Sequence, residues 1–238
     1  MLKLTRLTDE PLCCQNSPLG VMILSYAALC RTDEGYCRFY EQDDAAVVLQ
    51  NGSALVVCAK ENADFDEIRQ LADFLGCRTI LCENADLSDD QTVLTGSGLT
   101  MRGFFDKAEE PVHSPQTTAE YRAVYDLLEW READFDSWFA DVNLRIRRQT
   151  AAIAVAAENG EIVATASVLH RTPNSRVIGA VATKAGQRSR GFASALVRKL
   201  CAQTSYVLCL PELEGFYRRL GFSTCGRWFE YERIKETE

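Results

Sequence analysis

VIGAVATKAGQRSRGFASAL, residues 177–196, is the stretch that decides the fold. Its first part is rich in valine and isoleucine, which predicts a strand that ends near Thr183. Its last part is rich in alanine and leucine, which predicts a helix that begins near Gly191. Two arginines, Arg188 and Arg190, lie between them. The stretch therefore predicts a strand, a basic turn and a helix in immediate succession.

Such a turn is suited to binding an anion. The first N–H groups of a helix have no partner within the helix, and the helix dipole attracts negative charge to them. Gly191 lets a ligand approach the backbone, while Arg188 and Arg190 supply positive charge. The turn lacks both the Gly-Lys-Ser/Thr of nucleoside triphosphate loops and the GxGxxG of dinucleotide-binding folds. We interpret it as a pyrophosphate-binding turn of another type.

The chain as a whole divides into two halves. Pro111 and Pro115 stand among charged and hydroxyl residues, a composition typical of an exposed connection, so we predict domains over residues 1–112 and 113–238. Each half contains a hairpin, a strand, a helix and a further strand in the same order, and the hairpin turns are Asn51-Gly52 and Asn159-Gly160. This order predicts an α+β fold with a mixed, mostly antiparallel sheet flanked by helices, present twice.

Helix ends and helix faces can also be predicted. In the first half, Asp64 is the expected N-cap of a helix that stops at Gly76; in the second half, Thr118 is the expected N-cap. The basic run at 145–148 is interpreted as cations at a helix C-terminus. The aromatic residues of the second-half helices predict core packing, with an acceptor pocket as the alternative; they are Trp130, Trp138 and Phe139.

Composition limits the function. The chain has 238 residues, a formal net charge of −8 and a pI near 5. This charge argues against a nucleic-acid or anionic-membrane partner, because phosphate contacts need clustered lysine and arginine. The sequence has no long apolar run, and its first residues lack the apolar core of a signal peptide, so we expect a cytoplasmic protein.

Ten cysteines are scattered along the chain. None of their spacings forms a paired zinc-ligand set, and the histidines are only His113 and His170. We therefore expect no metal site, and we expect the cysteines to be reduced, buried side chains.

The turn and a second motif resemble a known family. Arg188–Ala193, RSRGFA, is similar to the Arg/Gln-x-x-Gly-x-Gly/Ala signature of the GNAT superfamily of acyl-coenzyme A N-acyltransferases, and residues 215–222, GFYRRLGF, are similar to its later Phe-Tyr…Leu-Gly-Phe motif. The resemblance covers the second half; the first half shares only the element order. It implies a GNAT-like fold, two tandem domains, and acetyl-coenzyme A as cosubstrate. The residues implied in cofactor binding are Val181, Ala182, Thr183, Arg188, Ser189, Arg190, Gly191, Phe192, Ala193, Ser194 and Phe216.

The same resemblance implies a catalytic tyrosine. Tyr217 occupies the place of the family's general acid, and a phenol of pKa near 10 is suited to protonating a departing thiolate. The alternative is that Phe216 and Tyr217 only pack the short helix against the sheet. Many relatives carry a glutamate base on the central strand, but RVIGAVAT here has no carboxylate. Water or another group must take the proton, and the candidates are His170, Glu129, Glu132, Asp134 and Asp141.

These features predict an N-acetyltransferase that moves an acetyl group from acetyl-coenzyme A to a primary amine by direct attack in a ternary complex. The acceptor is a small molecule or a peptide amine, and the sequence does not name it. The alternative is a non-catalytic acyl-coenzyme A-binding regulatory module, and a third interpretation is a structural protein in which the basic turn only begins a helix. Acyl chain length and a homodimer remain open.

Overall fold

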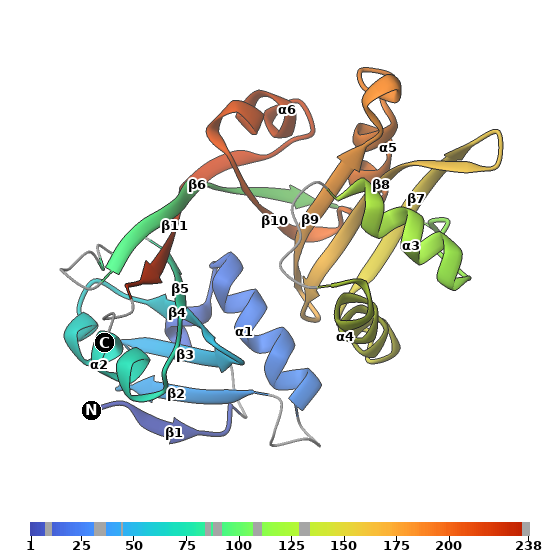
Figure 1. Ribbon diagram of the computed structural model, residues 1–238. Helices are drawn as coiled ribbons and strands as arrows, with labels where there is room; N and C mark the ends of the chain where they lie inside the picture. The colour runs from blue at the N-terminus through green and yellow to red at the C-terminus, as the bar shows by residue number, and fades with distance from the viewer. Residues whose placement is uncertain are drawn as a thin grey trace. The chain divides into compact units, whose positions relative to one another are not determined.

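The chain folds into two compact units, seen in the computed structural model of the protein (Figure 1). The structure describes residues 1–7, 11–30, 37–43, 45–83, 87, 92–106, 111–128 and 134–234. Unit 1 consists of Met1–Met101, Leu208–Glu214 and Thr224–Glu238; unit 2 consists of Arg102–Val207 and Gly215–Ser223. Each unit therefore uses more than one stretch of the chain. The predicted domain boundary at residue 112 stays a prediction.

Unit 1 is a mixed sheet with a helix on each face. Its strands lie in the order β1-β2-β3-β4-β5-β11-β6. The pair β4–β5 is parallel, whereas β1–β2, β2–β3, β3–β4 and β5–β11 are antiparallel. The elements are β1 (Lys3–Thr5), η1 (Leu12–Cys14), α1 (Pro18–Leu29), β2 (Arg38–Gln42), β3 (Ala46–Asn51), β4 (Ala54–Ala59), α2 (Phe65–Phe74), β5 (Thr79–Glu83), β6 (Thr92–Phe105) and β11 (Ser223–Arg233).

The core of unit 1 explains its apolar strands. Along β3, Val47 and Leu49 pack with α1, whereas Ala46 and Val48 pack with α2. Successive residues of a strand point to opposite faces, so a strand covered on both sides is apolar throughout. Asp64 caps α2, as predicted, by accepting a hydrogen bond from the Glu67 N–H at 3.0 Å.

A carboxyl group lies at the beginning of α1. Glu83, the last residue of β5, accepts a hydrogen bond from the hydroxyl of Ser17, the N-cap of α1. Burial is the main cause that raises the pKa of Glu83 to about 7, and hydrogen bonds from Ser17 and the Leu19 N–H oppose the rise. Glu83 therefore keeps its proton to a higher pH in the folded chain than in the unfolded chain.

This difference predicts that Glu83 contributes more to the stability of the chain at pH 5 than at pH 8. Between pH 4.5 and about 7 the unfolded state binds fewer protons at Glu83, so the free energy of unfolding falls as pH rises through that window. The whole fall is about 3 kcal/mol at 1.36 kcal/mol per pKa unit. Urea unfolding at pH 5 and pH 8 should show a free energy of unfolding that changes less favourably with rising pH in wild type than in Glu83→Gln, by about 3 kcal/mol. An equal change in both proteins would contradict the assignment.

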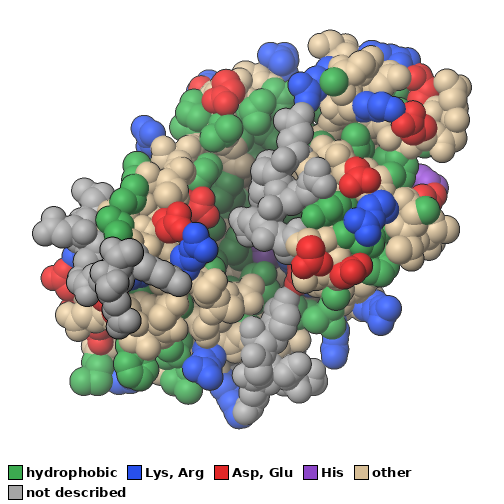
Figure 2. All heavy atoms as spheres, viewed as in Figure 1, with side chains coloured by type: hydrophobic (Ala, Val, Ile, Leu, Met, Phe, Trp, Pro, Cys, Tyr) green, Lys and Arg blue, Asp and Glu red, His purple; other side chains and the backbone are tan. Residues whose placement is uncertain are grey.

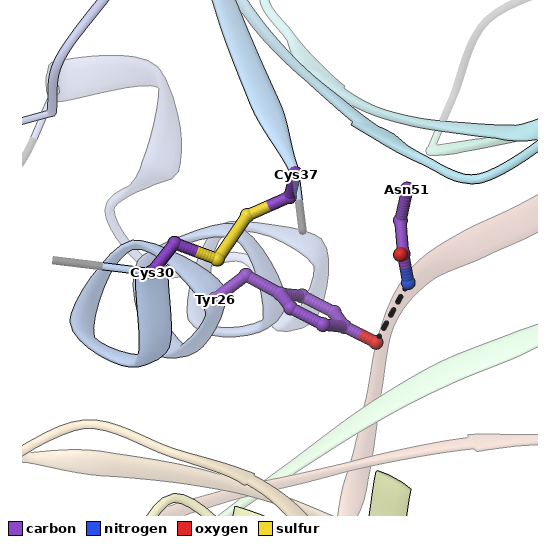
Figure 3. Close-up of a disulfide and its surroundings, with 4 residues drawn as sticks. All are labelled: Tyr26, Cys30, Cys37 and Asn51. Carbon is purple, nitrogen blue, oxygen red and sulfur yellow. Dashed lines mark hydrogen bonds between the residues drawn. A yellow bond between two sulfur atoms is a disulfide. The ribbon is translucent and has the colours of Figure 1, made fainter. Parts of the chain in front are cut away.

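A disulfide joins Cys30 to Cys37, so the prediction of reduced cysteines is wrong for this pair (Figure 3). Cys30 follows the last turn of α1, and Cys37 lies just before β2 in the same core cluster. Packing of α1 against the sheet thus brings together thiols that lie seven residues apart. Tyr26 extends beside the disulfide, and its hydroxyl accepts a hydrogen bond from Asn51 at 3.1 Å (Figure 3). The other cysteines form no disulfide, and all of them except Cys225 are buried.

Unit 2 repeats the plan with its own run of strands and helices. Its strands lie in the order β10-β9-β8-β7, in which β7–β8 and β8–β9 are antiparallel and β9–β10 is parallel. The elements are α3 (Thr118–Leu127), α4 (Phe135–Arg147), β7 (Ala152–Glu158), β8 (Glu161–Arg171), β9 (Ser175–Thr183), η3 (Ala185–Gln187), α5 (Phe192–Leu200), β10 (Gln203–Cys209) and α6 (Glu214–Arg218). The short helix η4 (Pro211–Leu213), between β10 and α6, belongs to unit 1.

Helices α3 and α4 form one aromatic layer of unit 2. Tyr121 and Tyr125 of α3 make edge-to-face contacts with Phe139 and Phe135 of α4, at ring-centroid distances of 5.1 Å and 5.5 Å. The same cluster includes Ile153 and Val155 of β7 and Trp138, so the predicted core role of the described aromatics is confirmed. Trp130 lies outside the described residues.

The N-cap prediction for α3 was one residue late. Thr117, not Thr118, caps the helix, because its side chain accepts from the Glu120 N–H at 3.2 Å. The Glu120 carboxylate in turn accepts from the Thr117 N–H at 3.0 Å, which completes a capping box. Adjacent threonines made the two positions equivalent in the sequence, and the glutamate three residues later favours Thr117.

The internal repeat is present in the order of elements. In unit 1 the antiparallel strands β2, β3 and β4 are followed by α2 and then by β5, parallel to β4. In unit 2 the antiparallel strands β7, β8 and β9 are followed by α5 and then by β10, parallel to β9. The connection from β9 to α5 therefore has a counterpart in the connection from β4 to α2.

The surface mixes charges of both signs. On the face shown in Figure 2, lysine and arginine side chains lie apart from one another and among acidic ones. Within the described ranges, no helix is both long enough and apolar enough to cross a membrane.

Candidate active site

Strand β9 carries a bulge at its centre. Gly179 pairs with Ser167 of β8 and Ala182 pairs with Thr165, so two residues of β9 lie opposite the single residue Ala166. One of the two is Ala180, which has a φ of 47°, in the left-handed region that non-glycine residues seldom adopt. The bulge thus directly follows Gly179.

Gly179 itself is needed for close packing. A Cβ added to it would lie 2.4 Å from Cδ1 of Leu169 on the neighbouring strand. The glycine therefore lets the Leu169 side chain cover the backbone immediately before the bulge.

Beyond the bulge, β9 extends past its parallel partner. The β9–β10 register ends at Ile178 and Val207, whereas β9 continues to Thr183. The residues from Gly179 to Thr183 are all partly exposed. The edge of β9 that precedes the basic turn is thus the edge along which an extended ligand could hydrogen-bond to the backbone.

The turn after β9 leads directly into an uncapped helix. Helix α5 has Gly191 at its N-cap, in the left-handed region with φ 86°, and no side chain caps it. Ser189, with φ 63°, is a second left-handed residue of the turn. The first helical N–H groups, from Phe192 to Ser194, therefore have neither a helical partner nor a capping side chain. Nothing lies within 4 Å of the position that a Cβ of Gly191 would take, so the turn is open there.

The two arginines of the turn have different surroundings. Nε of Arg188 donates to the carbonyl oxygen of Thr183 at 3.3 Å. Arg190 instead forms a bidentate ion pair with Glu158 of β7, with both N···O distances 2.7 Å. The hydrogen bond from Arg190 lowers the pKa of Glu158 and raises that of Arg190. Arg188 and Arg190 are thus not equivalent, although both are cations of the same turn.

Phe216 and Tyr217 lie together on α6. The Tyr217 side chain is buried, and its ring makes edge-to-face contacts with Phe216 at 4.9 Å and with Phe222 at 5.8 Å between centroids. Phe222 also contacts Phe105 of β6, at 5.4 Å. The packing predicted as the alternative role for these residues is therefore present, and it fixes the orientation of the phenol ring. The catalytic role of Tyr217 stays a prediction.

His170 lies at the other end of the strand pair. It is buried on β8 opposite Val177, at the beginning of β9, which places it six strand residues, about 20 Å at 3.3 Å per residue, from Thr183. Its Nδ1 and Nε2 lie 3.1 Å and 3.5 Å from Nη2 of Arg145, which can only donate, so a neutral His170 accepts from the guanidinium. Burial, with the charge of Arg145 as a second cause, lowers the pKa of His170 well below its usual value. These contacts favour a structural role, and the role of His170 as general base stays a prediction.

Arg145 belongs to the same buried network. It is bonded to the carbonyl oxygen of Leu169, and its Nη1 lies 3.3 Å from the carboxylate of Asp141. The basic run at 145–148 was interpreted as a group of cations at a helix end, but Arg145 is buried. The charge of Arg145 is balanced by Asp141, and its side chain links α4 to β8.

The acidic base candidates serve structural purposes where they are described. Asp134 is the N-cap of α4 and accepts from the N–H groups of Asp136 and Ser137 at 2.9 Å and 3.0 Å. These bonds, with the Ser137 backbone as the largest cause, lower the pKa of Asp134. Asp141 pairs with Arg145. Glu129 and Glu132 lie outside the described residues. Among the described residues, no group of three or more histidine, cysteine, aspartate or glutamate side chains is placed to hold a metal ion.

The corresponding connection in unit 1 is built differently. Helix α2 is capped by the Asp64 side chain and has Asp66 and Glu67 in its first turn. The carboxylate cap already occupies a first-turn N–H group that an anion would need, and the two further acidic residues would repel an anion. The β3–β4 register is continuous, and the Cys58 thiol at the end of β4 donates to the carbonyl oxygen of Cys13 at 3.0 Å. The features of β9 and α5 therefore have no equivalent at β4 and α2.

Residues 149–224 match the sequence model of the acetyltransferase (GNAT) domain family, which confirms the resemblance predicted for the second half of the chain. This segment contains β9, the turn, α5 and α6. The sequence matches none of the curated proteins with which it was compared.

Solved structures share the fold over nearly the whole chain. A GCN5-related N-acetyltransferase from Kribbella flavida has a TM-score of 0.64 at 11% identity, over 96% of this chain and 98% of that one. One from Sphaerobacter thermophilus has a TM-score of 0.58 at 15% identity, over 100% and 96%. A tandem GNAT protein from the clavulanic acid biosynthesis pathway has a TM-score of 0.58 at 12% identity, over 100% and 99%. The predicted GNAT-like fold with a two-domain arrangement is confirmed.

Proposed function

We propose that the chain is an N-acetyltransferase that transfers an acetyl group from acetyl-coenzyme A to a primary amine by direct attack in a ternary complex. The observation that carries the proposal is the open edge of β9, from Gly179 to Thr183, which leads through Arg188 to the uncapped start of α5. Family membership of residues 149–224 supports acetyl transfer in general. The cosubstrate, the amine acceptor and the residue roles are our proposal.

The residues present fit an acyl-coenzyme A. The cofactor has a pyrophosphate, which needs N–H donors and positive charge. It also has an extended arm with amide groups, which can hydrogen-bond along a strand edge. In unit 2 the N–H groups of Phe192, Ala193 and Ser194 and the charge of Arg188 would hold the pyrophosphate. The backbone of Val181, Ala182 and Thr183 would hold the arm. When bound, acetyl-coenzyme A would supply an acyl group activated as a thioester.

The bulge has a chemical role in this proposal. Because Ala180 is left-handed, the backbone beside it is turned away from the regular ladder direction. An N–H group there can polarise a carbonyl oxygen without reorganising, which is the most effective form of electrostatic catalysis. Tyr217, whose ring is fixed by Phe216 and Phe222, would hold a proton at its Oη for the departing thiolate.

The described candidates for the general base have other partners. Asp134 and Asp141 are engaged in capping and ion pairing, and the ring of His170 is buried against Arg145. We therefore propose that water takes the proton from the amine. The non-catalytic acyl-coenzyme A-binding module is the alternative that this feature favours, and it predicts binding without transfer to any amine.

Unit 1 takes no cofactor in this proposal. Its α2 begins with the acidic residues Asp64, Asp66 and Glu67, and its β4 lacks a bulge. We propose that this half is a GNAT-like domain without a cofactor site, which supports unit 2 or shapes the acceptor site.

Replacement of Arg188 by alanine tests the proposal. The variant removes one cation from the turn but leaves the backbone N–H groups, so we expect acetyl-coenzyme A to bind about tenfold more weakly. The measurement is the rise in thermal midpoint with added acetyl-coenzyme A in wild type and in the variant. Arg148→Ala, at the end of α4, is the matched control and should behave as wild type. An equal rise in wild type and Arg188→Ala would argue against this phosphate site.

A further inference from the structure

The hairpin that joins β7 to β8 carries two acids in an unfavourable arrangement. Glu158 and Glu161 flank the Asn159-Gly160 turn and are paired directly across the ladder. Both turn residues are left-handed, with φ 53° and 81°, which defines a tight hairpin of type I′. Like charges directly opposite each other destabilise a hairpin. A destabilising local pair of this kind is expected to be compensated by a stabilising or functional interaction elsewhere.

The two acids hold the two ends of the basic turn. Glu161 pairs with Nζ of Lys184, at 2.5 Å, where β9 ends. Glu158 pairs with Arg190 through two bonds of 2.7 Å, one residue before the N-cap Gly191. The side chains of Glu158, Glu161, Lys184 and Arg190 thus form a carboxylate clamp across residues 184–190.

The Arg190 side of the clamp is the stronger one. A bidentate arginine–carboxylate pair fixes orientation as well as distance. The same guanidinium is hydrogen-bonded to the side-chain oxygen of Gln187 and lies 5.1 Å from the ring centre of Phe192. Exposed single ion pairs contribute little, but a network with good geometry contributes more. The Lys184 end is also held by its backbone, because its N–H donates to Val163 at 2.9 Å.

We infer that Glu158 is a positioning residue for the acyl-coenzyme A pyrophosphate, acting through Arg190. It holds Arg190 toward β7, and so fixes the left-handed residues Ser189 and Gly191 in the shape that directs the α5 N–H groups outward. Arg190 is then a structural cation whose charge is balanced by Glu158, and Arg188 is the arginine that faces the phosphate. This inference rests on the proposed function, because it assigns the ligand of the turn.

The test compares four variants in two measurements. The variants are Glu158→Gln, the matched control Glu161→Gln, Arg190→Ala, and the charge exchange Glu158→Arg with Arg190→Glu. The first measurement is the Kd of coenzyme A by calorimetry, and the second is amide hydrogen exchange of residues 184–191 without any ligand. The second measurement reports on the turn itself and does not require that the chain bind coenzyme A.

The clamp predicts a particular order of effects. Glu158→Gln and Arg190→Ala should each weaken coenzyme A binding about tenfold and speed amide exchange in the turn, since each removes the same charged pair. Glu161→Gln should change the Kd less than about twofold, because the Lys184 backbone stays in the ladder. The charge exchange should restore both the affinity and the slow exchange, because it re-forms the pair with the partners reversed.

Two results would overturn the inference. In the first, Glu158→Gln leaves the affinity unchanged or tightens it. In the second, the charge exchange binds as weakly as Arg190→Ala; either result would mean that Arg190 itself contacts the phosphate. If wild type binds no coenzyme A, the proposed function fails instead. The exchange measurement then decides the clamp: faster exchange in Glu158→Gln than in Glu161→Gln supports it, and equal exchange rejects it.

Discussion

Replacement of Tyr217 by phenylalanine should lower kcat for acetyl transfer by about 100-fold, within the usual contribution of a general acid. The variant keeps the ring that contacts Phe216 and Phe222, so the fold of α6 should be unchanged. It removes only the hydroxyl that we propose as proton donor. The KM for acetyl-coenzyme A should therefore change little. Initial rates with a panel of primary amines measure both constants.

A second buried tyrosine provides the control. Tyr206 of β10 is almost completely buried in the same unit, and we propose no chemical role for it. Tyr206→Phe should keep the kcat of wild type, while its thermal midpoint reports the cost of losing a buried hydroxyl. If Tyr217→Phe and Tyr206→Phe have the same kcat as wild type, the packing interpretation of Tyr217 is correct and another group protonates the thiolate.

Replacement of Gly191 by valine should weaken acetyl-coenzyme A binding by at least about tenfold. Gly191 has φ 86°, and a β-branched residue in that region is strained by about 1–3 kcal/mol. No atom lies within 4 Å of the added Cβ, so the loss would come from the backbone of the turn rather than from a clash with the protein. Titration calorimetry with acetyl-coenzyme A measures the effect.

Gly186 is the matched position in the same turn. It also has open space around an added Cβ, but its φ is outside the left-handed region. Gly186→Ala should therefore bind acetyl-coenzyme A as wild type does. Equal affinities for Gly191→Val and wild type would show that the left-handed N-cap does not shape the ligand site.

Local patterns were sufficient to predict much of the fold. The hairpin at Asn159-Gly160, the Asp64 cap and the beginning of α5 at Gly191 all depend on residues next to one another in the chain. Each of these residue types has a conformational preference strong enough to be recognised alone. The order of elements that revealed the repeat was the sum of such local signals.

Long-range features could not be predicted in the same way. Ala180 is left-handed because the β8–β9 register has an extra residue there, and an alanine gives no local sign of it. The burial of Arg145 against His170 joins residues that lie 25 positions apart. The pairing of Arg190 with Glu158 spans 32 positions. The sequence did contain a sign of this last pairing. Glu158 and Glu161 flank the predicted hairpin turn, and Lys184 and Arg190 lie on either side of Arg188 in the predicted anion-binding turn.

The most direct test of the account is the number of coenzyme A molecules bound per chain. Titration calorimetry on the whole wild-type chain should give one site, because unit 2 has the open strand edge and the uncapped helix, whereas unit 1 has an acidic, capped helix. Arg188→Ala should weaken that site. Two sites per chain would contradict the role assigned to unit 1. No binding at millimolar coenzyme A would contradict the proposed function as a whole.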